Sequence, residues 1–188
     1  MNHNWLVTDD GQYHPFGHPH VSEPGQYYRL YRFLTDLEDI LATFHDDISR
    51  LEAITPLVRK LLTSSYWLRT TYQLPHPDQG WATHSLYQEQ DFPLTLHMVC
   101  WRPGYQAKLQ THDTWGILAL VSGQDCHELW HHSPQAQSPH ALEPRQDLLL
   151  NPGDVLAFTR HSSHRVGPQG EVPTVALGLY GAPMITMG

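Results

Sequence analysis

The chain lacks the long apolar segment that a membrane-spanning helix requires. No run of about 18 apolar residues occurs in its 188 residues. Its first residues, MNHNWLVTDDGQYH, contain neither the basic region nor the apolar core of a secretory signal peptide. We therefore expect a soluble, cytoplasmic protein with no membrane partner.

Cysteine and positive charge are also scarce. The two cysteines, Cys100 and Cys126, are too few for a disulfide scaffold, and neither belongs to a Cys-x-x-Cys motif. Lys and Arg total 11 against 19 Asp and Glu, so the net charge is −8. The few basic residues are scattered along the chain, which disfavours binding to a phosphate backbone, and we expect no nucleic-acid partner.

The N-terminal part has the pattern of helices that follow an irregular arm. The first 25 or so residues are rich in Gly, Pro, His and Asn, which predicts a loop or extended arm. From Glu23 to Asp46, apolar residues recur at spacings of 4, 3, 4 and 3, as in an amphipathic helix. A second helix is expected at TPLVRKLL, with Thr55 as its N-cap, Pro56 in its first turn and an end near Ser64.

Beyond Trp67, short β-rich runs alternate with Pro- and Gly-containing turns. The runs are LTLHMVCW, GILALVSG, CHELWH, DLLL, DVLAF and TVALGLY. Many short strands at regular spacing are typical of a sandwich or barrel. We predict a mainly β barrel with an α-helical N-terminal segment. Residues 1–75 would form the arm and helices and residues 76–188 the barrel, in one cooperative unit.

The segment GYQAKLQTHDTWGILALVSG, from Gly104 to Gly123, has the spacing of a metal-binding hairpin. It resembles the first motif of the cupins: Gly, five residues, His-x-His, three or four residues, Glu, six residues, Gly. In this register Gln110 stands at the first His position, His112 at the second and Gly116 at the Glu position. Residues i and i+2 of a strand point to the same side, so positions 110 and 112 can face one ion.

A second segment, NPGDVLAFTRHSSHRV, resembles the second cupin motif. Its turn is Pro152-Gly153-Asp154 and its ligand position is His164, with His161 three residues earlier. Together the two segments imply a cupin fold, the double-stranded β-helix or jelly-roll barrel. They also imply that His112 and His164 are metal ligands.

Longer stretches are similar to the cysteine dioxygenase-type thiol dioxygenases, especially their bacterial branch. The similarity spans roughly residues 27 to 184 and includes SSYWLRTTYQLPHPDQG, SLYQEQDFPLTLHMVCWRPG, QTHDTWG and LGLYGAPM. It implies an Fe(II) ion held by three neutral histidines without a carboxylate, with which Gly116 agrees. It also implies a small thiol and O2 as substrates, a sulfinate as product, and Tyr180 as a catalytic residue.

Three positions depart from that family. Gln110 replaces the first His ligand, and an amide is a weaker ligand for Fe(II) than imidazole. Gln110 is thus either a ligand or a buried amide that hydrogen-bonds His112 or water. The family's substrate-binding Arg would fall near His84, and the His expected two residues before Tyr180 is Gly178. The basic residues nearest to His84 in the sequence are Arg69, Arg102 and Lys108.

Strand alternation supplies the other candidates. His97 has the same parity as Val99 and Trp101, which faces the pocket in the family. His97 is therefore a candidate third ligand or a polar group near the metal. Val99 and Trp101 would line the substrate pocket, or else pack in the core, and His84 would bind a substrate carboxylate or simply hydrogen-bond. The residues interpreted as barrel wall or surface are Cys126, His127, His131 and His132.

These observations leave three functions open. The first is an Fe(II) oxygenase of the thiol dioxygenase type, acting on a small thiol or related acid other than cysteine. In it His112, His164 and either Gln110 or His97 hold the metal, and Tyr180 hydrogen-bonds the substrate or oxygen. The second is a cupin with another divalent metal and non-oxygenase chemistry, and the third is a non-catalytic cupin that binds a small molecule. Exposed aromatic residues near the N-terminus would permit a homodimer.

Overall fold

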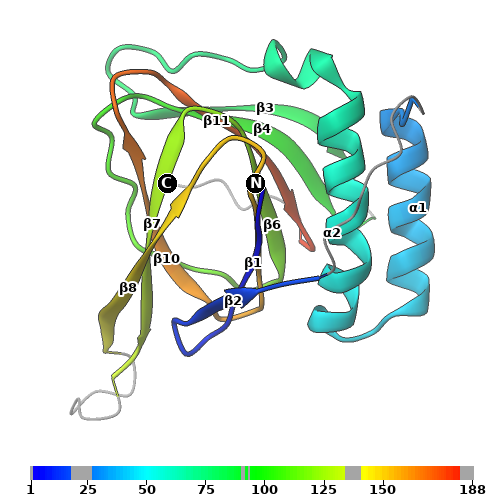
Figure 1. Cartoon of the computed structure of the whole chain (residues 1–188), viewed down its shortest axis with the longest axis horizontal. Coiled ribbons are helices and arrows are strands. Elements are labelled where there is room, and N and C mark those ends of the chain that lie inside the picture. Colours follow the sequence, from blue (N-terminus) through cyan, green and yellow to red (C-terminus); the bar gives the residue numbers. More distant parts are fainter. Residues whose placement is uncertain (1, 18–26, 90–91, 93, 134–140, 183–188) are drawn as a thin grey trace.

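The computed structural model describes the whole chain except residues 1, 18–26, 90–91, 93, 134–140 and 183–188. Its strands form two sheets that face each other across a barrel, and two helices lie outside the barrel (Figure 1). The larger sheet has the strand order β2-β1-β9-β6-β11-β4-β3 and the smaller one β5-β10-β7-β8. This arrangement confirms the predicted fold class, a mainly β cupin-type barrel with an α-helical N-terminal segment. None of the described helices is long and apolar enough to cross a bilayer.

The elements in chain order are β1 (Asn4–Val7), β2 (Tyr13–Pro15), α1 (Leu30–Thr43), α2 (Asp47–Ser64), the 3-10 helix η1 (Tyr66–Arg69), β3 (Trp81–Gln88), β4 (Thr95–Trp101), β5 (Gln110–Thr111), β6 (Gly116–Ser122), β7 (Gln124–His132), β8 (Leu142–Leu150), β9 (Val155–Phe158), β10 (Ser163–Gln169) and β11 (Thr174–Tyr180). Each β-rich run recognised in the sequence coincides with one of these strands. The strand expected at positions 110 and 112 is the short β5, whereas the sequence patterns did not reveal β1, β2, β3 or β10.

Side chains of the larger sheet alternate between two separate apolar clusters. On β4, Met98 and Cys100 belong to the cluster under the helices, whereas Val99 belongs to the cluster inside the barrel. The interior cluster also contains Leu129 and Val166 from the smaller sheet, so both sheets contribute to it. Because the alternation has a period of two, each central strand of the larger sheet serves a helix layer and a barrel interior at once.

The helices differ at their N-terminal ends from the sequence prediction. Helix α1 begins at Leu30, and residues 27–29 are not helical. The hydroxyl of Tyr28 donates to Asp36 Oδ2 at 2.5 Å, which folds the segment before the helix back onto α1. Residues 23–26 of the predicted helix lie outside the described residues. Figure 1 shows α2 between α1 and the barrel.

Thr55 is not the N-cap of α2, so that prediction is wrong. The cap is Asp46, whose side chain accepts a hydrogen bond from Ser49 N at 2.8 Å. Thr55 is buried inside the helix, and its hydroxyl donates to Leu51 O at 2.7 Å. Asp46 is the cap because its carboxylate accepts a hydrogen bond from a backbone N–H of the first turn that has no partner within the helix. Pro56, expected in the first turn, therefore lies in the helix interior.

The predicted N-terminal arm contains the first strand of the barrel. Strand β1 pairs in parallel with β9, with Asn4 opposite Val155, and antiparallel with β2. Val7 is fully buried in the interior cluster. Residues 18–26 of the arm are not among the described residues. The division at residue 75 stays a prediction, although β1 joins the first part of the chain to the barrel sheet.

Arg59 of α2 ties β1 to the turn of the second motif. Its guanidinium donates to Asn4 Oδ1, to Gly153 O at 3.1 Å and to His3 O at 2.8 Å. In the same turn, Asp154 accepts from His3 N at 2.7 Å. Gly153 has a φ of 92°, a conformation that favours glycine. One cation thus links the helix, the first strand and the turn that leads to β9.

We expect Arg59→Met to destabilise the protein by about 2–3 kcal/mol, because several hydrogen bonds to a charged, half-buried group are lost together. The matched control is Arg32→Met, which removes an exposed pair with Asp36 and should cost no more than about 0.5 kcal/mol. Urea denaturation of both variants measures the difference. Equal losses would show that Arg59 does not tie these segments together.

Candidate functional site

The two predicted metal-ligand segments meet through a short antiparallel pairing of two strands. In the pairing of β5 with β10, Gln110 lies opposite His164 and residue 111 opposite residue 163. One residue further on, His112 N donates to Ser162 O at 3.1 Å, and His161 N donates to His112 O at 2.7 Å. These bonds place His112 next to His164, while the side chain of His161 is exposed.

The rings of His112 and His164 touch through their Nε2 atoms, which are 3.0 Å apart. Burial lowers the pKa of His112 to about 4 and holds the pKa of His164 well below its usual value of 6.5. Both rings are therefore neutral at pH 7, and one donates to the other according to its tautomer. Two metal–nitrogen bonds of about 2.1 Å at right angles would hold their nitrogens about 3 Å apart. The pair thus has the spacing of two adjacent ligands of one ion.

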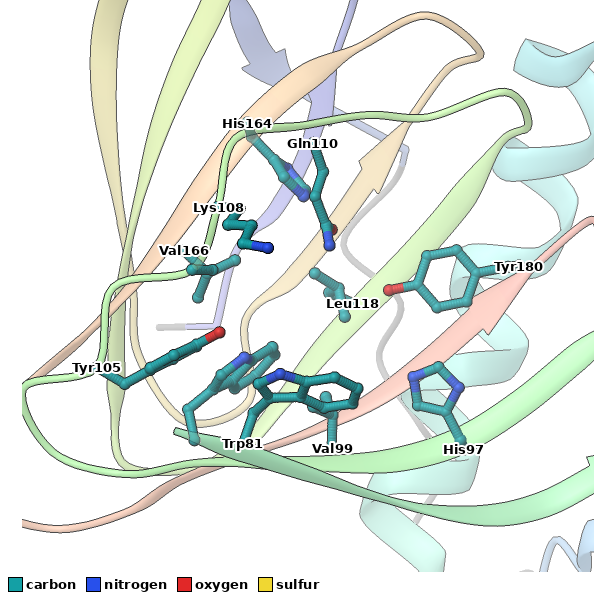
Figure 2. Close-up of a pocket in the computed structure, with 12 residues that line it drawn as sticks. Trp81, His97, Val99, Tyr105, Lys108, Gln110, Leu118, His164, Val166 and Tyr180 are labelled. Carbon is teal, nitrogen blue, oxygen red and sulfur yellow. The ribbon is translucent and has the colours of Figure 1, made fainter. Parts of the chain in front are cut away.

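The donor set differs from three histidines. Among the described residues, no three His, Cys, Asp or Glu side chains converge as a metal site requires. This corrects the prediction that His97 could be a third ligand. Gln110 faces the same side of the β5–β10 pair as His164, because directly opposite residues share a face. Its amide points into the same space (Figure 2). The residues fit a site of two imidazoles and one amide.

Gly116 leaves no room for the carboxylate of the general cupin motif. A Cβ atom there would lie 2.3 Å from the Phe158 ring. That ring packs against His112, with 4.3 Å between centroids. The glycine therefore admits an apolar ring beside the metal-ligand position, and the neutral donor set follows from packing.

Gly178 makes space for His97, which lies opposite it on the neighbouring strand β4. A Cβ atom at Gly178 would lie 2.8 Å from His97 Nε2. The His97 ring stacks on Tyr180, with centroids 5.4 Å apart and planes at 24°. Tyr180 also stacks on His112 at 6.0 Å. Tyr180 thus has a histidine neighbour, supplied by β4, although the residue two positions before it is glycine.

Two of the predicted substrate-binding residues, Val99 and Trp101, line one cavity of about 160 Å³ in the barrel. Its aromatic wall is Trp81, Trp101 and Tyr105, and its aliphatic wall is Val99, Ala107, Leu118 and Val166. Its polar lining is His97, Lys108, Gln110, His164 and Tyr180. The volume lies below the roughly 300–1,000 Å³ of drug-sized sites, which favours a small ligand.

The polar groups of the cavity are mostly neutral. Burial lowers the pKa of His97 to about 4 and raises the pKa of the Tyr180 phenol, so at pH 7 the ring is neutral and the phenol keeps its proton. Among the described residues that line the cavity, Lys108 alone has a cationic side chain. Figure 2 shows its ammonium and the Tyr180 hydroxyl directed into the same space. The cavity lining therefore includes one cationic side chain and one hydroxyl donor.

His84 does not line this cavity, which corrects its predicted contact with substrate. It lies opposite Met98 in the β3–β4 pairing, whereas Thr83 lies opposite Val99. Residues directly opposite each other share a face, and Met98 belongs to the cluster outside the barrel. The alternation of β3 therefore turns His84 away from the substrate cavity.

Sequence reasoning missed several residues of the site. Trp81 lies opposite Trp101 in the β3–β4 pairing, a contact that only the register reveals. His127 was interpreted as wall or surface, but it is fully buried, with its ring 5.1 Å from that of His164. The parity of His127 with the apolar Leu129 was a signal for an inward side chain. Lys108, noted only as a nearby basic residue, lines the cavity.

Several solved structures resemble the fold, although no family model matches the chain. A cupin superfamily protein from Desulfitobacterium hafniense DCB-2 has a TM-score of 0.45 and 14% identity over 58% of this chain and 84% of that chain. KdgF from Halomonas sp. has a TM-score of 0.44 and 18% identity over 62% of this chain and 92% of its own. An oxalate oxidase in complex with the substrate analogue glycolate has a TM-score of 0.44 and 13% identity over 60% of this chain and 56% of its own. At these values the likeness concerns the fold alone.

The buried histidines predict a loss of stability in acid. The pKa of His127, like those of His97 and His112, is lowered by burial, here to about 3. Unfolded histidines take up protons near pH 6.5, so the metal-free protein should lose stability as pH falls from about 6.5 towards 4. Burial raises the pKa of Asp125 to about 7, so this group stabilises the folded protein as the pH falls. Its effect is smaller than the combined, opposite effect of the four histidines with lowered pKa values.

We expect a loss of at least about 2 kcal/mol in the free energy of unfolding between pH 6.5 and 5. Denaturant titrations of chelator-treated protein at several pH values measure it. His97→Phe should flatten the curve by about 1.4 kcal/mol per pH unit. The control His76→Asn changes an exposed ring and should follow the wild-type slope. A stability that does not change over this range would contradict the neutral, buried histidines.

The contact of His97 with Gly178 predicts a coupled pair of substitutions. Gly178→Ala should destabilise the protein by about 1–3 kcal/mol, because its methyl group overlaps the His97 ring. In a His97→Ala background the same change should cost at least about 1 kcal/mol less, since the overlap is gone. Urea midpoints of the two single variants and the double variant give the coupling energy. Additive effects would show that the two side chains do not compete for this space.

Proposed function

We propose that the chain is a metal-dependent cupin oxygenase that binds Fe(II) and acts on a small thiol or a related acid other than cysteine. The observation that carries the proposal is the 3.0 Å separation of His112 Nε2 and His164 Nε2, two neutral imidazoles beside a small cavity. Neutral imidazoles do not have to lose a proton before they bind a metal.

His112 and His164 would hold the metal, with the Gln110 amide as a weaker third donor. Fe(II) bound there would supply open positions for a thiolate and for O2. Around the metal position, the Phe158 ring packs on His112, and no carboxylate side chain fits at Gly116. A donor set without negative charge suits an anionic sulfur ligand, which supports a thiol substrate.

The cavity residues would orient the substrate. Lys108 would bind an anionic group, while Trp81 and Trp101 exclude water from the apolar part of the molecule. The Tyr180 phenol, which keeps its proton at neutral pH, would donate a hydrogen bond to a substrate heteroatom. His97 stacks on the Tyr180 ring and so holds it in place, with its hydroxyl directed into the cavity (Figure 2).

The thiol substrate and the iron rest on the sequence resemblance. The hairpin QTHDTWG and the strand segment LGLYGAPM are the stretches that favour this chemistry over that of other cupins. Residues 183–184, at the end of the second stretch, lie outside the described residues.

A second candidate is a cupin that holds another metal or binds a small molecule without catalysis. It is favoured by the amide at position 110 and by the lack of a third converging His, Cys, Asp or Glu among the described residues. The two candidates differ in metal content and in oxygen consumption, both of which can be measured on the same preparation.

Elemental analysis of untagged protein should find near-stoichiometric iron. The His112→Ala variant should lose it, with affinity at least about 100-fold lower, whereas Gln110→Ala should show a smaller loss because an amide is the weaker ligand. His161→Asn is the matched control, because this exposed residue has a φ of 69° that Asn tolerates, and it should keep its metal. Zinc, nickel or manganese in place of iron would favour the second candidate, as would protein that stays metal-free after anaerobic loading.

Oxygen consumption by iron-loaded protein tests the reaction itself. An oxygen electrode with 3-mercaptopropionate, cysteamine and cysteine should record uptake with at least one of the first two thiols. Tyr180→Phe should lower kcat by about 10²–10³-fold, the range for one lost hydrogen-bond donor to the reacting group. No uptake with any thiol, in protein shown to contain iron, would refute the oxygenase.

A further inference from the structure

Two polar side chains lie in the barrel interior behind His164, outside the cavity lining. Asp125 and His127 point inward from β7, together with Leu129. Asp125 is 1% exposed and His127 is fully buried. The His127 ring packs edge-on with the His164 ring, with ring planes at 67°, and its Nε2 lies 4.0 Å from Asp125 Oδ2.

Four atoms of this group are buried without a hydrogen-bond partner among the described residues. They are Nδ1 and Nε2 of His127, Nδ1 of His164 and Oδ1 of Asp125. Buried polar atoms are nearly always paired with protein groups or with ordered water. Because the four atoms belong to three neighbouring side chains, a bridging water or a small shift of the rings would pair them with one another.

The tautomer of His164 links this group to the cavity. To bind a metal through Nε2, His164 must carry its hydrogen on Nδ1. That nitrogen is buried without a partner among the described residues, and the His127 ring packs against the same imidazole. A neutral imidazole has one accepting and one donating nitrogen. His127 can therefore accept from His164 and donate to Asp125.

We propose that His127 and Asp125 form a buried relay that holds His164 in the Nδ1–H tautomer, directly or through one water, so that its Nε2 lone pair faces His112. The role of the relay in metal binding rests on the proposed metal site, whereas the tautomer of His164 is a property of the metal-free protein. His127 is a positioning residue, because it acts on the metal through His164. Partners of this kind typically change metal affinity 10–100-fold.

Nitrogen-15 NMR of the metal-free protein tests the relay without any metal. Long-range proton–nitrogen spectra, assigned with a His164→Gln variant, should show His164 as the Nδ1–H tautomer in the wild type. In His127→Leu, which has no polar group, His164 should become a mixture or the Nε2–H form. His127→Gln offers both an acceptor and a donor and should retain the wild-type tautomer. His164 in the Nε2–H form in the wild type would overturn the proposal without reference to any variant.

Metal competition gives the second readout. With Co(II) and a chromophoric chelator, His127→Leu should weaken binding 10–100-fold, Asp125→Asn several-fold, and His127→Gln less than His127→Leu. Leu129→Met is the matched control, because it changes an inward neighbour on the same strand and should leave the affinity unchanged. Equal affinity in wild type and His127→Leu, or equal loss in the Leu and Gln variants, would overturn the relay. Wild-type protein that binds no metal would refute the proposed function, while the NMR result still decides the relay.

Discussion

The approach of His112 to His164 depends on a short stretch of backbone, and the rest of the site is arranged around it. Strand β5 consists only of Gln110 and Thr111, yet its pairing with β10 continues into two backbone hydrogen bonds at His112. The loop before β10 reaches this position through His161, whose φ of 69° is uncommon for a residue other than glycine. The exposed side chain of His161 has no part in the site. What the loop contributes is the path of its backbone, which brings two neutral rings within 3.0 Å.

The barrel interior buries three neutral histidines, His97, His127 and His164, beside apolar side chains, and His112 is half-buried next to them. Such burial costs stability, and a protein retains it where the groups serve a site. Two glycines make the arrangement sterically feasible. Gly116 admits Phe158 against His112, and Gly178 admits His97 against Tyr180. The absence of two side chains thus shapes the site as much as the histidines do.

Local patterns in the sequence were sufficient for the β-rich runs, the two turns and the parity of His97. Equivalence with the resembling family placed His84 in the pocket, and that prediction failed because such an equivalence does not reveal which face of β3 is inward. That face depends on pairing with β4, whose register shifts between Ser85 and Tyr87. Strand β1 was missed because its four residues belong to the barrel only through pairing with β9, far along the chain. Thr55 was a plausible cap locally, but the Asp46 carboxylate has that role, about two and a half helical turns upstream.

By itself, the sequence determined a mainly β fold with an N-terminal helical segment, and it marked the positions at which His112 and His164 could act. These features are local, since they follow from the alternation of side chains along a strand and from turn residues. Only the tertiary structure decided which rings meet. His112 and His164 are 52 positions apart, and their contact exists because β5 pairs with β10. Strand pairing likewise placed His97 over Gly178 and His127 behind His164, because distances between remote residues are set by register and not by spacing along the chain.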